Sequence, residues 1–255
     1  MKHLSSFIFT AAALLPFTQP LFAQQSGVIE YEVTAKTDPN RMRGFQRDGD
    51  DASERPDVIT FKQTFTFNNN VGKLATERPD FGDRRPQRQR RDSSAQGPRR
   101  MGMGGRGNNA QYIDLANKKY QQVFSTFGDD KKTYYTEEDF LIGTNSKPGD
   151  KTKKIAGYAC KKATIQLKDD TYTVWYTTDL PFSFSPINGL LPESKAVVLS
   201  AEGSKRSFVA KNVSLKAVTD ADLNIPAGAE KVSQEQMREI RKQEMEKFRK
   251  RQPQQ

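Results

Sequence analysis

The sequence predicts a mainly β protein, built on a single curved antiparallel sheet with one helix at its C-terminus. Apolar and polar residues alternate through several segments, which is typical of half-buried strands. Short polar clusters separate these segments at the spacing of hairpin turns. Helical periodicity is not found between residues 27 and 223, whereas a helical pattern occupies the C-terminal residues.

The first 23 residues are typical of a secretory signal. Lys2 supplies a positive start, residues 7–15 (FIFTAAALL) form an apolar stretch, and Ala23 is a small residue at the expected cleavage position. Nine apolar residues are too few to cross about 30 Å of hydrocarbon as a helix. The cleavage position is not followed by a cysteine. We therefore expect an exported protein, periplasmic or associated with the outer membrane and not a lipoprotein; a buried N-terminal helix is the alternative.

Strand patterns begin directly after this leader. In residues 28–34, Ile29, Tyr31 and Val33 share one face, and residues 59–67 repeat the alternation. Polar turn clusters such as 68–70 predict hairpin connections. Further strands are expected at residues 111–114, 120–126, 132–136, 160–167, 171–177, 196–201 and 206–215. The domain of residues 24–230 is thus predicted to hold eight to ten strands.

A basic segment at residues 78–108 interrupts the strand pattern. Residues 78–106 contain nine arginines and three aspartates but only one aromatic residue. Such a segment cannot bury enough apolar surface to offset its ordering entropy, so we expect a disordered insert. It is either a solvating linker or a contact to an anionic surface. Its candidate contact residues are Arg84, Arg85, Arg88, Arg90, Arg91, Arg99, Arg100 and Arg106.

Residues 231–255 are predicted to form a charged helix and tail. Ser233 and Gln236 have the spacing of a capping box. A narrow apolar stripe follows on one side of the predicted helix: Met237, Ile240, Met245 and Phe248.

Composition excludes several kinds of chemistry. The only histidine is His3, inside the predicted leader, so histidine-dependent nucleophiles and histidine-rich zinc sites are excluded. Cys160 is the only cysteine; it is either a reactive thiol or, as we favour, a buried structural residue. The net charge of +10 is concentrated in the insert and the tail, which leaves the predicted sheet nearly neutral. We expect neither an enzyme nor a cofactor or metal.

Residues 153–199 contain three short sequence motifs that resemble those of a known protein family. The motifs are IAGYACKKA at 155–163, VWYTTDLP at 174–181 and GLLP at 189–192. They resemble the GLPGLI family of exported bacterial proteins, although Gly-Leu-Leu-Pro-Glu-Ser stands where that family has Gly-Leu-Pro-Gly-Leu-Ile. The resemblance implies an antiparallel β fold in the cell envelope, an association with outer-membrane receptors, and no catalytic residues to carry over.

The same stretch also has a physical interpretation. Prolines end regular pairing, Asn188-Gly189 is a turn dipeptide, and phenylalanines alternate with serines. We expect either a packed loop that closes the core or the rim of an apolar concavity, in a half-barrel like that of periplasmic lipoprotein carriers. The candidate rim residues are Trp175, Tyr176, Phe182, Phe184, Gly189 and Pro192.

These observations favour a non-enzymatic envelope protein. It would bind an apolar small molecule or lipid, or assist an outer-membrane receptor. The alternative is an interaction protein that docks on anionic lipid or lipopolysaccharide through its insert and tail. Nucleic acid is not expected as a partner of an exported chain. An open face lined by Phe65, Phe67, Trp175 and Phe184 would favour the ligand, whereas a closed core would favour docking.

Overall fold

The computed structural model describes residues 26–37, 57–77, 110–126, 131–219 and 222–251. Twelve strands and one helix occupy them. Their bounds in chain order are β1 Ser26–Lys36, β2 Val58–Asn68, β3 Val71–Thr76, β4 Gln111–Asp114, β5 Lys119–Ser125, β6 Thr133–Asp139, β7 Lys147–Ile155, β8 Tyr158–Leu167, β9 Asp170–Thr177, β10 Val197–Glu202, β11 Arg206–Leu215, β12 Glu230–Lys231 and α2 Gln234–Arg251. The predicted leader, the insert 78–108 with its eight candidate arginines and the side chain of Phe248 lie outside the described residues.

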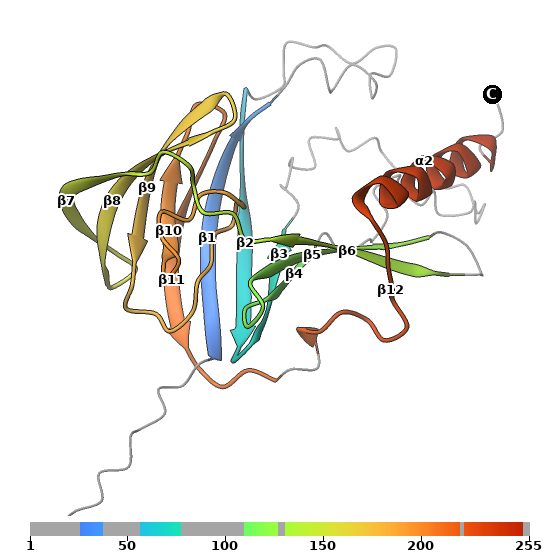
Figure 1. Ribbon diagram of the computed structural model, residues 1–255, viewed down its shortest axis with the longest axis horizontal. Helices are drawn as coiled ribbons and strands as arrows, with labels where there is room; N and C mark the ends of the chain where they lie inside the picture. The colour runs from blue at the N-terminus through green and yellow to red at the C-terminus, as the bar shows by residue number, and fades with distance from the viewer. Residues whose placement is uncertain (1–25, 38–56, 78–109, 127–130, 220–221, 252–255) are drawn as a thin grey trace, which may run out of the picture.

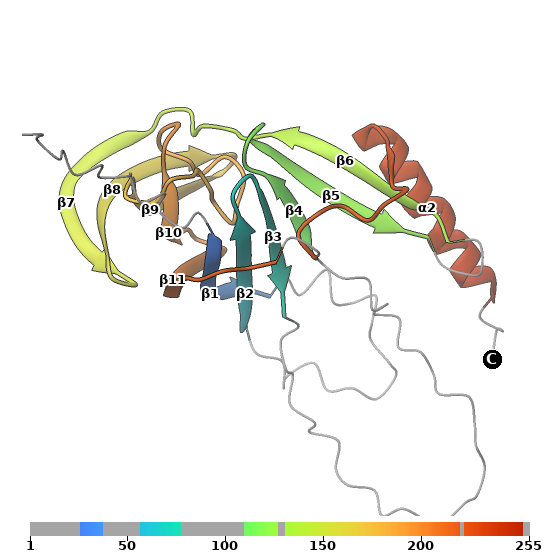
Figure 2. The same ribbon diagram turned by 90° about the horizontal axis from the view of Figure 1, so that it is seen from below.

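All twelve strands belong to one open sheet. Their order is β12-β6-β5-β4-β3-β2-β1-β11-β10-β9-β8-β7, and every pair is antiparallel except β12 with β6. The sheet curls strongly from β3 round to β7, while the β5–β6 hairpin extends away at the opposite end (Figures 1 and 2). The prediction of a mainly β fold with a single curved sheet and a C-terminal helix is confirmed.

Three strands were not predicted from the sequence. β7 does not alternate, because all its residues except Ile155 are exposed. β3 is short and follows a tight turn at Asn69, whose φ is +48°. β12 has only two residues and pairs with a strand nearly a hundred residues earlier. In each case the strand is defined by its partner rather than by its own pattern of polarity.

The concave face of the sheet holds an aromatic core. Phe65 and Phe67 on β2 stack with ring centroids 5.6 Å apart, as expected for residues two apart on one strand. Tyr31 on β1 meets Phe208 on β11 edge to face at 5.7 Å. The Tyr31 hydroxyl donates a 3.0 Å hydrogen bond to the carbonyl of Val198, so this buried polar group is satisfied.

Helix α2 begins at the predicted capping box and lies beside the β5–β6 hairpin (Figure 2). The Gln236 amide N–H bonds to the Ser233 hydroxyl, and the Ser233 amide N–H bonds to the Gln236 side chain. Met237 is buried, whereas Met245 is 42% exposed, so only part of the predicted apolar stripe is covered. In the described residues, α2 is too polar to count as a candidate membrane span.

The buried hydroxyl of Tyr120 provides a test of the packing. It donates a 2.6 Å hydrogen bond to the carbonyl of Ser185, a fully buried residue. Tyr120→Phe should lower the free energy of unfolding by about 1–3 kcal/mol, because the carbonyl loses its partner without access to water. Tyr158→Phe, at a half-buried tyrosine, is the control and should change it by less than about 0.5 kcal/mol. Equal effects in urea titrations would contradict this packing.

Candidate functional site

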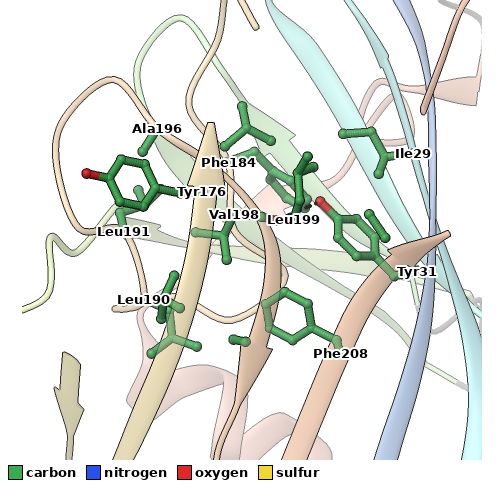
Figure 3. Packing of buried hydrophobic residues seen from close by; sticks show 14 of the residues in the cluster. Ile29, Tyr31, Tyr176, Phe184, Leu190, Leu191, Ala196, Val198, Leu199 and Phe208 are labelled. Carbon is green, nitrogen blue, oxygen red and sulfur yellow. Dashed lines mark hydrogen bonds between the residues drawn. The ribbon is translucent and has the colours of Figure 1, made fainter. Parts of the chain in front are cut away.

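The predicted rim residues lie in or beside the segment 178–196, which connects β9 to β10 and packs in the concavity of the sheet (Figure 3). Phe184 stacks on Phe65 with ring centroids 3.6 Å apart, and Phe182 lies 4.3 Å from Phe67 by the same measure. Phe65, Phe67 and Phe184 have no exposed surface. The segment therefore supplies part of the core that the sheet encloses.

Backbone hydrogen bonds attach this segment to the neighbouring strand. The Phe184 amide donates to the carbonyl of Ala196 at 3.0 Å, and the Val198 amide donates to the carbonyl of Phe184 at 2.9 Å. The Ser183 hydroxyl donates to the Ser194 carbonyl at 2.7 Å. A loop in the interior must satisfy its own polar groups, and these bonds do so.

The turn at residues 187–192 joins the segment to the β6–β7 connection. The Asn188 side chain accepts a hydrogen bond from the Leu141 amide and donates one to the Asp139 carbonyl, each at 2.9 Å. The Gly143 amide donates to the Leu191 carbonyl at 2.8 Å. Leu141 is 55% exposed, so apolar surface remains at this end of the molecule.

The predicted rim residues are thus divided between two environments. Tyr176, Phe184 and Gly189 are buried, while Phe182 and Pro192 are half-buried. This arrangement favours the loop that closes the core over an open apolar face at Phe184. The role of the six residues in ligand binding stays a prediction.

Trp175 lies on the outer face of the sheet. It pairs with Lys162 on β8 and with Ser200 on β10, and residues paired across a ladder point to the same side. Its neighbour Val174 is fully buried on the inner side. The Lys153 ammonium lies 4.2 Å from the centroid of the indole ring. Sequence reasoning missed Lys153, because the contact depends on the register of β7, a strand without a sequence signal.

Cys160 is a buried thiol with no exposed surface. Burial raises its pKa to about 11, although a backbone hydrogen bond and the charge of Lys153 act in the opposite direction. A nucleophilic or redox cysteine needs a lowered pKa and access to solvent. The environment of Cys160 is that of a structural residue.

Two acidic residues of β6, Glu137 and Glu138, attach the C-terminal segment. Glu137 forms an ion pair with Lys231 on β12, and this hydrogen bond lowers the pKa of its carboxyl group. Glu138 accepts a hydrogen bond from the Gln234 side chain at 2.9 Å. Within the described ranges, histidine, cysteine and carboxylate side chains do not gather in groups of three or more that could hold a metal ion.

Comparison with known proteins gives one matching family model and two solved structures of similar fold. A family model described as "N-glycanase peptide, N-terminal domain" matches residues 107–200. Two solved structures of PNGF-II, in space groups C2 and P21, share the fold with TM-scores of 0.55 and 0.52 at 18% identity. Each alignment covers 86% of this chain but only 33% and 34% of the PNGF-II chains, so this chain spans about a third of their length. Curated proteins gave no match.

The resemblance to the GLPGLI family is wrong. The matching family model, at residues 107–200, contains the whole stretch on which that resemblance was based, and its description is that of an N-glycanase N-terminal domain. Two of the quoted motifs contain tight turns, and the third, VWYTTDLP, begins within strand β9. Ala156-Gly157 forms a hairpin turn with φ values of +47° and +90°, and Gly189 forms another turn with φ of +93°.

Two glycines with similar backbone angles test the packing of the 187–192 turn. A Cβ added at Gly189 would lie 2.8 Å from Leu167 Cδ1, whereas one added at Gly157 would meet nothing within 4 Å. Both substitutions to alanine impose the strain of a positive φ, about 1 kcal/mol. Gly189→Ala should lower the free energy of unfolding by about 1 kcal/mol more than Gly157→Ala, because Leu167 must also move. Equal losses in urea titrations would show that the turn is loosely packed.

The thiol of Cys160 gives a pH-dependent test. With a pKa near 11 against an ordinary value of 9.0, the folded protein at pH 8 should react with iodoacetamide at least about 100-fold more slowly than the urea-unfolded chain. Stability should fall as the pH rises from 9 to 11, since the unfolded thiol ionises first. Similar alkylation rates in the folded and unfolded protein, followed by mass spectrometry, would contradict a buried thiol.

Proposed function

We propose that this chain is a non-enzymatic binding or accessory domain that serves the handling of glycan chains outside the cytoplasm. The observation that carries the proposal is the shared fold, over 86% of this chain, with about a third of PNGF-II, together with the match to an N-terminal domain of N-glycanase type. The sequence-predicted leader at residues 1–23 supports an exported location.

The packing of the sheet supports binding on its outside. Phe184 and its aromatic neighbours fill the concavity, which argues against a lipid or other apolar ligand in that position. Trp175 is the aromatic rim residue on the outer face. The flat apolar face of an indole is suited to the C–H face of a sugar ring, and nearby hydroxyl groups are suited to its polar edge.

A second candidate function is docking on an anionic envelope surface through the insert and the tail. It is favoured by the nine arginines of residues 78–106 and by the closed core. Deletion of residues 78–108 should abolish retention on vesicles containing phosphatidylglycerol at low salt, if this function applies. Equal retention of the full chain and the deletion variant would contradict this second function.

A binding measurement tests the first proposal. The purified chain should bind a glycoprotein that carries N-linked chains and should not bind the same protein after enzymatic removal of those chains, as followed by interferometry. Trp175→Ala should weaken this binding at least about fivefold, because the stacking surface is lost. Tyr134→Ala, at a half-buried tyrosine on β6, is the control. Equal binding to the two glycoprotein forms would contradict the proposal.

The proposal that the chain is not an enzyme is tested by mass spectrometry of the glycoprotein. After prolonged incubation with the purified chain, the mass of the glycoprotein should be unchanged. Release of its N-linked chains would show that the chain is a catalyst.

A further inference from the structure

Strands β7 and β8 carry lysines that form no ion pair within the described part of the chain. Between Lys147 and Lys162 there are six lysines and one aspartate. The ion pairs in the described part of the chain use other lysines, namely Lys119, Lys205, Lys211, Lys231 and Lys247. β7 is the edge strand of the sheet (Figures 1 and 2). All its residues except Ile155 are exposed.

The strand register gathers part of this charge around Trp175. Lys162 pairs with Trp175 across β8 and β9, and the Lys153 ammonium lies over the indole ring. Lys147 pairs with Thr164, which in turn pairs with Thr173, two residues before Trp175 on the same face. One tryptophan, three lysines and several hydroxyl-bearing side chains therefore share this surface.

From this arrangement we infer that the outer face around Trp175 binds an acidic polysaccharide, one whose sugar rings carry carboxylate groups. Trp175 is half-buried, and its accessible ring surface contacts a sugar face once the Lys153 ammonium swings off the indole. Lys153 and Lys162 then pair with carboxylates on the same or the adjacent sugar. Threonine and serine hydroxyls are suited to the sugar hydroxyls between them. The inference rests on the proposed function and specifies the class of glycan and the surface that holds it.

Lysines on an edge strand also prevent sheets from pairing edge to edge, and this alternative needs no ligand. The two explanations differ in which lysines matter. Protection of an edge depends on the charge of the whole strand. A glycan site depends on the lysines beside Trp175, which are Lys153, by its contact with the indole, and Lys162, by its pairing across β8 and β9. It does not depend on their chain neighbours Lys154 and Lys161.

Two double variants of the full chain separate these explanations. Lys153→Gln/Lys162→Gln removes two charges beside Trp175, and Lys154→Gln/Lys161→Gln removes two charges from the adjacent positions of the same strands. Binding to polygalacturonate is measured by titration calorimetry at low and at physiological salt, with neutral dextran and phosphatidylglycerol vesicles as the other probes. The wild type should bind polygalacturonate more tightly than it binds dextran or the vesicles. The first variant should weaken this binding about tenfold and the second less than twofold.

Other outcomes overturn the inference in distinguishable ways. Equal weakening by both variants, or no weakening by either, would show that these lysines act through general charge or as edge protection. Tighter binding of the wild type to vesicles would identify a lipid surface instead. Binding to the N-glycoprotein without binding to polygalacturonate would overturn this inference alone, whereas failure to bind any of the glycans would overturn the proposed function as well.

Discussion

The stacking of Phe184 on Phe65 is the contact on which the rest of the structure depends. An open, strongly curved sheet leaves one apolar face without a second layer, and such a face must be covered to be stable. Here the segment 178–196 supplies the cover from within the same chain, and Phe184 lies at its centre with no exposed surface. Once this position is filled, the concave face is core, and functional surface has to be found elsewhere.

The two ends of the sheet then differ in chemistry. At one end, Glu137 and Glu138 of β6 bind Lys231 and the side chain of Gln234, which attaches the C-terminal segment. At the other end, the lysines of β7 and β8 form no ion pair among the described residues, and two of them, Lys153 and Lys162, lie beside Trp175. The first set of charges attaches the C-terminal segment, whereas the second set forms no ion pair among the described residues.

Sequence reasoning recovered the strands that have one solvent-exposed face and one buried face. β1, β9 and β11 were predicted closely because Ile29, Tyr31 and similar residues alternate with polar ones. It could not recover β7, since a strand with exposed residues on both faces has no alternation. The alternation at Phe182 and Phe184 was recognised, but periodicity does not tell whether an apolar face lines a cavity or fills it. That outcome depends on Phe65, more than a hundred residues earlier in the chain.

The distribution of charge in the folded protein also could not be predicted from the sequence. Summed over the sheet, acidic and basic residues nearly cancel, so the sequence placed the basic character in the insert and the tail. The fold separates the two signs in space, and a basic surface appears where Lys153, Lys162 and Trp175 meet. Neither their proximity nor their common face follows from spacing, because both depend on the register of β7 and β9 against β8.

Amide hydrogen exchange of the segment 178–196 tests most directly whether the concavity is core. If the segment is part of the core, the amides of Phe184 and Val198 should exchange only through global unfolding, at the same free energy as the central amides of β1 and β2. Exchange of these two amides several kcal/mol below that limit, with β1 and β2 still protected, would show a detachable lid over a binding cavity and would contradict the account.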